Sequence, residues 1–273
     1  MTDTTVAAPV PWEEPRRPRP TWGFDEGDEL AHGRTVLRRL GGGRRYETLL
    51  VWDEHRLAVL VAKVLRPDCA NDPQALRELA HEAVLLERLA HPVVVRSFGS
   101  VPDGRFPHLV LEHLEGPTLD ELLAQQGPLA LEQLLPLGLH VASALHYLAG
   151  ERVVHLDVKP SNIVMGGPPR LIDLSVARTF EDAAALRIPI GTDAFMAPEQ
   201  QAPNGDVGPA ADIYGLAKTL ARALPRRTPR ELAAIVTAGL ADDPAARPTA
   251  REFAVALEPL VAALPRRMTL GRR

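Results

Sequence analysis

The chain has 273 residues, of which 45% are hydrophobic, and its formal net charge is −4. This length allows one large domain or two lobes with a sizeable core, and the slightly acidic balance argues against a nucleic-acid partner. The single cysteine, Cys69, excludes an internal disulfide framework and is typical of a reducing compartment. No segment approaches the roughly 18–20 consecutive apolar residues of a membrane span. We therefore expect a soluble cytoplasmic protein with no membrane span.

The first 33 residues are rich in proline and charge and show little hydrophobic periodicity. Such a segment buries too little apolar surface to order itself, so a disordered tail is expected over residues 1–33. Trp12, Trp22 and Phe24 are able to dock on a surface, but the composition favours disorder.

The next part of the chain is rich in strand signals. Residues 35–40, 46–53 and 56–65 read as strands, and the third is apolar nearly throughout, which indicates burial on both faces. Asp72 and Pro73 begin a helix, as cap and first helical residue, that ends before His91. Two more strands are expected over residues 93–101 and 107–114.

After Gly116 the pattern becomes helical. Thr118 caps a helix that ends at Gly127, and a longer apolar helix follows over residues 130–150. Capping boxes are predicted at Thr228 and Thr249, each with a glutamate three residues later. The expected fold class is α+β with two lobes: a strand-rich lobe over 34–114, a mostly helical lobe over 115–265 and a short tail over 266–273. A ligand site is expected between the lobes.

Four polar side chains stand in two short apolar segments near the middle of the chain: Asp157, Lys159, Asn162 and Asp173. The two segments are able to pair as a hairpin and bring both carboxylates to one end. Carboxylate and amide oxygens without a sulfur or histidine cluster suit Mg²⁺. A carboxylate that is not needed for the metal is able to act as a base. A Mg²⁺–phosphate site is the leading interpretation, and the alternative is that these residues cap loops or are solvated.

Several motifs now line up in order. "HLDVKPSN" (155–162) matches the protein-kinase catalytic loop HRDxKxxN except at the arginine, "DLS" (173–175) stands at the DFG position, and "APE" (197–199) is complete. "LGGGRRYET" (40–48) resembles the Gly-rich loop, and "VAKVL" (61–65) resembles the lysine strand. Over about residues 34–262 the chain resembles a bacterial, actinobacterial-type, eukaryotic-like serine/threonine protein kinase domain.

The resemblance implies an enzyme that uses ATP and Mg²⁺. Catalytic roles would fall to Asp157, which orients or deprotonates the substrate hydroxyl, to Lys159, which neutralises the phosphoryl group, and to the pair Lys63–Glu82. Asn162 and Asp173 would hold the metal. The other nucleotide-binding positions that the resemblance implies are Leu40, Gly41, Gly43, Thr48, Val61, Leu111, Glu112 and Leu114.

The resemblance also implies structural contacts. His155 would support the catalytic loop, Asp212 would tie a helix to that loop, and Thr192 would contact Asp157 and Lys159. Glu199 and Arg247 would form a buried ion pair.

Four features depart from the family pattern. Tyr46 stands at the third glycine of the Gly-rich loop, and Ser175 replaces the glycine of DFG. Leu156 replaces the arginine that pairs with an activation-loop phosphate, so we predict activity without that phosphorylation. Asp212 and Arg247 are 35 residues apart (247 − 212), an interval that leaves little room for the family's helix G.

The leading function is phosphate transfer to serine or threonine hydroxyls of an unidentified protein substrate, with autophosphorylation as an option. Two alternatives stay open: an ATP-binding pseudokinase or scaffold with little turnover, and a kinase-fold enzyme that phosphorylates a small molecule.

Overall fold

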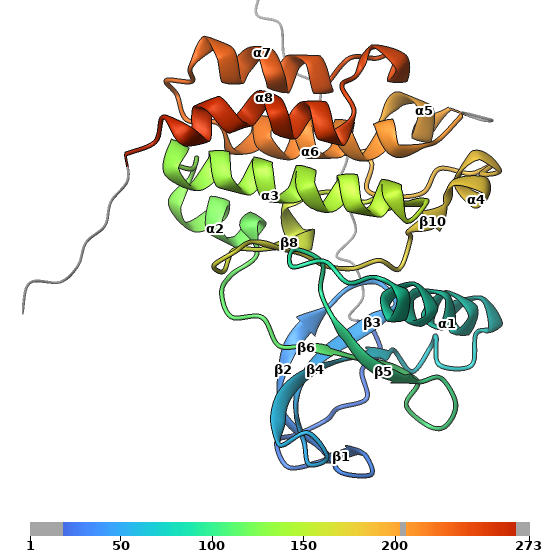
Figure 1. Cartoon of the computed structure of the whole chain (residues 1–273). Helices are drawn as coiled ribbons and strands as arrows, with labels where there is room; N and C mark the ends of the chain where they lie inside the picture. Colours follow the sequence, from blue (N-terminus) through green and yellow to red (C-terminus); the bar gives the residue numbers. More distant parts are fainter. Residues whose placement is uncertain (1–18, 203–205, 266–273) are drawn as a thin grey trace, which may run out of the picture.

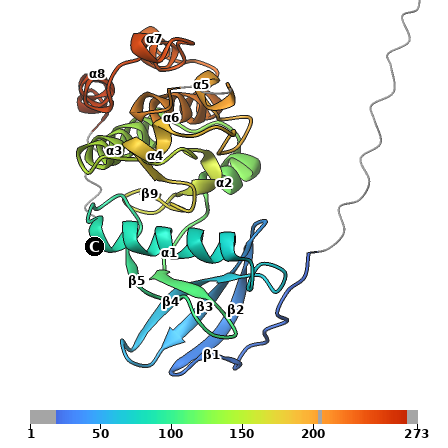
Figure 2. The ribbon, with the colours of Figure 1, turned by 90° about the vertical axis from the view of Figure 1, so that its right-hand side faces the viewer.

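The computed structural model describes residues 19–202 and 206–265, which form two lobes (Figure 1). The N-terminal lobe contains an antiparallel six-stranded sheet with the order β1-β2-β3-β4-β6-β5. Its strands are β1 (Glu29–Ala31), β2 (Arg34–Gly42), β3 (Tyr46–Asp53), β4 (Ala58–Leu65), β5 (Ser97–Val101) and β6 (His108–Glu112). Helix α1 (Pro73–Arg88) lies between this sheet and the larger lobe (Figure 2).

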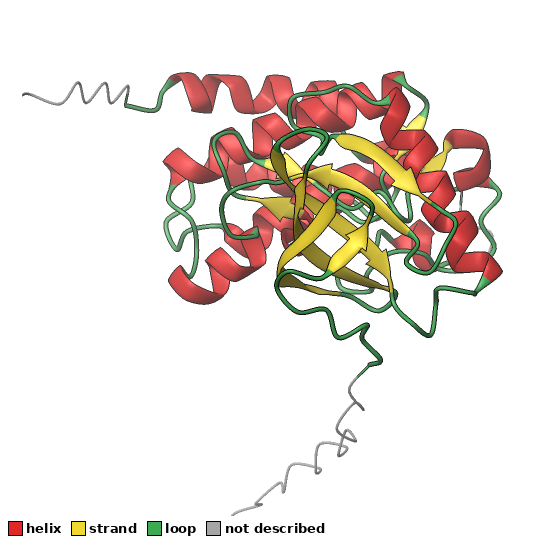
Figure 3. Cartoon of the chain, turned by 90° about the horizontal axis from the view of Figure 1, so that it is seen from below, coloured by secondary structure: helices red, strands yellow, loops and turns green. Residues whose placement is uncertain are grey.

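The C-terminal lobe is mostly helical, with the long apolar helix α3 at its centre (Figure 1). The helices are α2 (Leu119–Gln126), α3 (Leu131–Gly150), α4 (Phe180–Ala184), α5 (Pro198–Gln201), α6 (Pro209–Ala223), α7 (Arg230–Gly239) and α8 (Ala250–Ala262), with 3-10 turns η1 (Pro160–Asn162) and η2 (Pro244–Ala246). Two short strand pairs, β7 (Val153–Val154) with β10 (Arg178–Thr179) and β8 (Ile163–Val164) with β9 (Arg170–Leu171), carry the loops between α3 and α5. Figure 3 separates the strands from these helices by colour.

The two faces of the N-terminal sheet bury different sets of side chains. Alternate residues of a strand point to opposite sides. One face carries Tyr46, Leu65, Leu109 and Leu111, which join the main core together with α1 and the C-terminal lobe. The outer face carries a separate apolar cluster that includes Leu49, Val51, Leu60, Ala62, Val64 and Val110. The sheet therefore needs cover on both sides.

The expected tail over residues 1–33 is wrong for residues 19–33. Trp22 and Phe24 pack on the outer apolar cluster, and each ring lies 4.9 Å from the ring of Phe106, centroid to centroid. The Trp22 indole Nε1–H donates to the carbonyl of Leu65 (2.7 Å), and β1 extends the sheet. The composition gave a wrong prediction because contacts with the outer face of the sheet order this segment. It does not need to bury apolar surface within itself. Residues 1–18 and 266–273 lie outside the described residues.

The predicted helix caps are mostly confirmed. Asp72 caps α1, and Thr118 and Thr249 form capping boxes at α2 and α8. The capping box predicted at Thr228 is wrong: α7 follows Pro229, and the Thr228 hydroxyl donates to the carbonyl of Pro225 (2.8 Å). The Thr228 hydroxyl therefore bonds within the turn before α7 instead of capping that helix.

Most predicted strands are also confirmed, with one exception. The expected strand over 93–101 begins only at Ser97. Before it, Val94 forms an isolated parallel bridge to Leu171, so this stretch joins the two lobes rather than extending the sheet.

Candidate active site

The first polar cluster lies where β4, α1 and the loop after β9 meet. The ammonium of Lys63 donates to both carboxylate oxygens of Glu82, at 2.9 and 2.7 Å, and to Oδ1 of Asp173 at 2.7 Å. Lys63 and Glu82 are buried, whereas the side chain of Asp173 is 36% exposed. Three residues that are far apart in sequence thus meet on one ammonium group.

These contacts shift the pKa values of all three groups. Burial alone would lower the pKa of Lys63, but Asp173 and Glu82 outweigh it and raise that pKa above its ordinary value. Burial would raise the pKa of Asp173, but Lys63 outweighs it and holds that pKa below its usual range. Burial raises the pKa of Glu82, although Lys63 opposes this. One ammonium group thus faces two carboxyl groups in this cluster.

The residues that follow Asp173 hold it in place. The backbone N–H of Leu174 donates to Oε1 of Glu82 (3.1 Å), and its side chain is fully buried in the main core. Asp173 has a positive φ of 65°, an uncommon conformation for a non-glycine residue. The N–H of Ser175 donates to Oδ1 of Asp173 (3.4 Å), so serine is compatible with this turn.

The second polar cluster surrounds Asp157. Its Oδ2 accepts from the ammonium of Lys159 (2.7 Å) and from the amide of Asn162 (3.1 Å), and its Oδ1 accepts from the hydroxyl of Thr192 (2.8 Å). The Asn162 amide also donates to the Asp157 carbonyl (2.9 Å), which closes the loop on itself. The expected contact of Thr192 with Asp157 and Lys159 is confirmed.

A buried aspartate from α6 supports the backbone of this loop. The Asp212 carboxylate accepts the N–H groups of His155 and Leu156, both at 2.7 Å. These bonds hold Leu156 at a φ of +66°. His155 is fully buried, and its Nδ1 lies 3.3 Å from the N–H of Asp157. The predicted supporting contacts of Asp212 and His155 are therefore confirmed.

The two candidate metal ligands suit Mg²⁺ by their chemistry. The amide nitrogen of Asn162 is occupied by Asp157, which leaves its oxygen for another partner. Asp173 uses Oδ1 for Lys63 and Ser175, which leaves Oδ2. Carboxylate with amide oxygen is a hard-oxygen set, which suits this ion. Within residues 19–202 and 206–265, no group of three or more His, Cys, Asp or Glu side chains is placed to hold a metal, so a metal here would need further oxygens from a ligand or water.

The sheet brings the predicted nucleotide-binding residues onto neighbouring rungs. Thr48 pairs with Lys63, and Gly41 pairs with Thr48. Val61 pairs with Leu111 across the next strand. Residues opposite each other in an antiparallel pair point to the same side. Thr48, Val61, Lys63 and Leu111 therefore share the sheet face that is turned to the main core.

The other predicted nucleotide-binding positions lie at the ends of these strands. Leu40 is 39% exposed near the end of β2, and Gly43 follows that strand in the turn before Tyr46. Glu112 ends β6, and its carboxylate accepts from the N–H of Arg96 (2.6 Å) and from the guanidinium of Arg170. The backbone of Leu114 lies outside any element, and its N–H finds no partner within the described part of the chain. The contacts of the Glu112 carboxylate with Arg96 and Arg170 therefore fix the Glu112 side chain in place.

Comparison with known proteins assigns this arrangement to a family. The protein kinase domain family matches residues 34–242. The chain belongs to the protein kinase family. It is 32% identical over 197 residues to the probable serine/threonine-protein kinase PkwA of Thermomonospora curvata, which covers 71% of this chain and 26% of that protein. It is 28% identical over 231 residues to the serine/threonine-protein kinase PrkC of Bacillus subtilis, which covers 83% of this chain and 36% of that protein.

A third relative is similar to the chain to about the same extent. The serine/threonine-protein kinase PknB of Mycobacterium tuberculosis is 28% identical over 200 residues, which covers 70% of this chain and 32% of that protein. The chain thus spans between 26% and 36% of the length of these three kinases. Among the described residues, no helix has the length and apolar character needed to cross a membrane.

Tyr46, at the position of a family glycine, is the site residue whose role the sequence did not predict. Its ring centroid lies 4.5 Å from the ammonium of Lys63, and the residue is 8% exposed. Burial raises its pKa to about 12, although Lys63 opposes this. The hydroxyl is buried without a hydrogen-bond partner among the described residues. The ring therefore covers the lysine that would contact the phosphates. The one sequence signal for this role was the tyrosine at the third glycine position of the Gly-rich loop.

Leu156, which replaces the family arginine, packs in an apolar cluster. Its buried neighbours are Val154, Ala183, Ala197, Val207 and Ala211, and Phe180, Leu186 and Ile190 pack against them. Several of these residues belong to the segment between Asp173 and α5. Apolar burial thus holds this segment at the place where an arginine would bind a phosphate.

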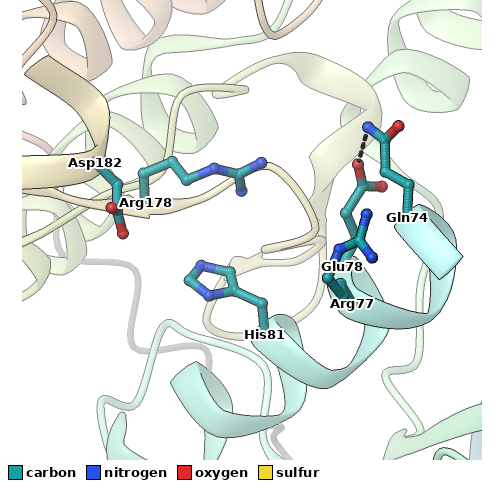
Figure 4. Close-up of a pocket in the computed structure, with 6 residues that line it drawn as sticks. All are labelled: Gln74, Arg77, Glu78, His81, Arg178 and Asp182. Carbon is teal, nitrogen blue, oxygen red and sulfur yellow. Dashed lines mark hydrogen bonds between the residues drawn. The ribbon is translucent and has the colours of Figure 1, made fainter. Parts of the chain in front are cut away.

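The same segment also contacts α1 beside a polar pocket. The ring Nε2 of His81 lies 3.0 Å from the carbonyl of Ala177. The pocket, of about 340 Å³, is lined by Gln74, Arg77, Glu78, His81, Arg178 and Asp182 (Figure 4). Arg178 extends toward α1, and Glu78 accepts from Gln74 at 3.1 Å. The pocket contains both charge signs.

The predicted ion pair between Glu199 and Arg247 is confirmed. The guanidinium donates to both carboxylate oxygens, at 2.7 and 2.8 Å, and also to the carbonyls of Ala210, Ala241 and Asp242. Residues 224–229 between α6 and α7 form no helix. The interval between Asp212 and Arg247 therefore contains most of α6, the single α-helix α7 and the short turn η2.

Proposed function

We propose that this chain is the catalytic domain of a serine/threonine protein kinase, which transfers the γ-phosphoryl group of ATP to serine or threonine hydroxyls of proteins. The observation that carries the proposal is the assembly of two polar clusters: Lys63 with Glu82 and Asp173, and Asp157 with Lys159, Asn162 and Thr192. The names of the three bacterial relatives support the same activity.

The roles of the residues follow from their charge and position. Asp157, with both oxygens already hydrogen-bonded, would orient the acceptor hydroxyl and take up its proton. Lys159, next to it, would place positive charge by the transferring group. Lys63, held by Glu82, would bind the α- and β-phosphates. Bound Mg²⁺ would neutralise phosphate charge, and Asn162 and Asp173 are the residues that would hold it.

We infer a cytoplasmic location and a signalling role. The chain has one cysteine, Cys69, which is half-buried and fits a reducing compartment. Phosphate transfer to proteins, including transfer to a second copy of this chain, would serve regulation.

The test is phosphate transfer from γ-labelled ATP with Mg²⁺, to the chain itself and to a generic basic protein. Asp157→Asn and Lys63→Met should each reduce transfer by about 10²–10⁴-fold, the range for loss of a positioned catalytic group. Asp103→Asn and Lys218→Met are matched controls, because both residues are exposed and distant in sequence from the two clusters. Acid-stable phosphoserine or phosphothreonine identifies the acceptor chemistry. Equal transfer by Asp157→Asn and the unchanged protein would contradict the assignment.

A second candidate function is an ATP-binding pseudokinase, favoured by the Tyr46 ring over Lys63. Saturable ATP binding without transfer above the Asp157→Asn background would support it. The third alternative, a small-molecule kinase, is favoured by the helix-free connection over residues 224–229. Transfer to a sugar or amino-alcohol panel, with none to proteins, would support that alternative.

A further inference from the structure

The outer side of the Gly-rich turn carries a strongly basic pocket. It has a volume of about 480 Å³ and is lined by Arg19, Thr21, Arg39, Gly42, Gly43, Arg44 and Arg66. These residues come from three parts of the chain: the N-terminal segment, strand β2 with the turn after it, and the residue after β4. The N-terminal segment runs beside β2 (Figure 2). The pocket therefore exists only when this segment is docked.

Arg66 is the buried side chain of the pocket, and hydrogen bonds hold it in place. The residue is 4% exposed, and its guanidinium donates from Nε to the carbonyl of Gly43 (3.0 Å) and from Nη1 to the carbonyl of Pro20 (3.0 Å). No acceptor for Nη2 is present among the described residues. A Cβ atom at Gly42 would lie 3.1 Å from that Nη2 and 2.5 Å from the carbonyl oxygen of Tyr46, so the absence of a side chain makes room for the guanidinium.

The charge of this pocket is not neutralised by its own lining. Four arginines line it, and no acidic residue does. The nearest carboxylate in the ion-pair contacts is the buried Glu47, which lies 3.7 Å from Arg39 and also accepts the N–H of Trp22 (2.9 Å). Guanidinium groups that line one pocket repel one another, and a multivalent anion would relieve that repulsion with charge-assisted hydrogen bonds.

Thr21 is the side chain in this pocket that is able to carry a phosphate group. It is exposed and lies between Pro20, which Arg66 holds, and Trp22, which is fixed to Leu65 and Glu47. Its hydroxyl has no hydrogen-bond partner in residues 19–202 and 206–265. A phosphate on Thr21 would add a charge of about −1.5 to −2 opposite an arginine cluster, an arrangement that orders a segment. We propose that this pocket is a phosphate-binding site whose ligand is phosphorylated Thr21, and that this phosphate clamps residues 19–24 onto the Gly-rich turn.

The source of the phosphate rests on the proposed kinase function. The Thr21 oxygen would attack the γ-phosphorus of ATP, the bond to the β-phosphate oxygen would break to release ADP, and the hydroxyl proton would pass to Asp157. Docked Thr21 lies outside its own Gly-rich turn, whereas Lys63 and Tyr46 lie on the face turned to the core. The acceptor is therefore an undocked segment, and we assign it to a second copy of the chain.

The binding step is tested without kinase activity. Thr21→phosphoserine is introduced by an expanded genetic code into the full chain that carries Asp157→Asn, and hydrogen exchange of residues 19–24 is measured with thermal unfolding. We expect exchange at the Trp22 amide to slow by about tenfold and the melting temperature to rise by about 2–4 °C. The gain should shrink at high salt because the contacts are ionic.

Paired arginine variants decide whether the pocket is responsible. Arg19→Gln with Arg44→Gln should remove most of the gain, whereas Arg226→Gln with Arg227→Gln, an exposed pair on the other lobe, should keep it. An equal gain in both double variants, or faster exchange after phosphoserine insertion, would overturn the site. If the phosphoserine protein fails to fold, inorganic phosphate is titrated against the unmodified chain. Saturable stabilisation that Arg19→Gln with Arg44→Gln removes supports the site, and a response identical in both double variants overturns it.

The phosphorylation step is tested separately by mass spectrometry. After incubation with ATP and Mg²⁺, phosphate should be found on Thr21 of an Asp157→Asn acceptor mixed with unmodified enzyme. Transfer to a basic protein without any on Thr21 would overturn self-phosphorylation as the source. Transfer to neither would instead contradict the proposed kinase function, while the exchange experiment still decides the site.

Discussion

At the scale of single residues, Tyr46 determines how accessible the ammonium of Lys63 is to a ligand. Its ring covers the ammonium of Lys63, and its hydroxyl is buried without a partner. A nucleotide whose phosphates contact Lys63 must displace this ring, so only a fraction of molecules is ready to bind. Tyr46→Gly should therefore tighten binding of Mg·ATP by about tenfold, measured by titration calorimetry, while the lost packing lowers the free energy of unfolding by about 3–5 kcal/mol.

Tyr46→Phe is the matched control for that prediction. It keeps the ring over Lys63, so the affinity for Mg·ATP should stay the same. The buried hydroxyl has no partner to lose, so stability should stay equal or rise by about 1 kcal/mol. Tighter binding by Tyr46→Phe would show that the hydroxyl, not the ring, is what limits access.

At the scale of elements, apolar packing holds the segment between Asp173 and α5. Leu156 lies in the cluster to which Phe180, Leu186 and Ile190 contribute. Since no arginine stands at Leu156 to pair with a phosphate, Thr179→Glu and Thr179→Ala should each change the transfer rate by less than about tenfold. Both also remove the hydroxyl that caps α4, so a small loss of stability is expected in each. A larger rise in rate with glutamate alone would contradict the prediction.

A second element, the N-terminal segment, contributes to the stability of the sheet. Trp22 packs on the outer face and donates to the carbonyl of Leu65. Trp22→Ala should lower the free energy of unfolding by about 2–4 kcal/mol, measured with urea. Trp22→Phe keeps the ring contact with Phe106 and should cost only about 1 kcal/mol, the usual net value of one hydrogen bond. Equal losses would mean that the packing of Trp22 adds nothing.

At the scale of the whole molecule, Glu199 and Arg247 connect α5 with the turn before α8. The pair is almost fully buried, and Arg247 donates to three backbone carbonyls besides the carboxylate. Arg247→Met would leave a buried carboxylate without its partner and should cost about 3–5 kcal/mol. Adding Glu199→Gln should recover part of that loss, seen as a partial return of the melting temperature. No recovery would show that the carbonyl contacts alone matter.

The order of elements and the residues of the catalytic loop could be predicted because both depend on local signals. Asp72, Thr118 and Thr249 are caps whose partners lie within three residues, and the structure keeps them. Asp157, Lys159 and Asn162 lie within one short loop, so their meeting needs no distant contact. The Gly-rich turn, the lysine strand and the catalytic loop were therefore identifiable in order along the chain.

Contacts between distant segments were decided only by the tertiary structure. Thr228 does not cap α7, because its hydroxyl donates to a carbonyl of the preceding turn. Trp22 packs on an apolar sheet face formed mainly by β2, β3, β4 and β6, which all begin more than ten residues later in the sequence. The ring of Tyr46 came to lie over Lys63 because β3 and β4 are neighbours in the sheet. The residues of this chain thus determine the chemistry available at the site by themselves. Which groups meet, and which of them is covered, depends on the surfaces that each segment finds once the sheet and helices have formed.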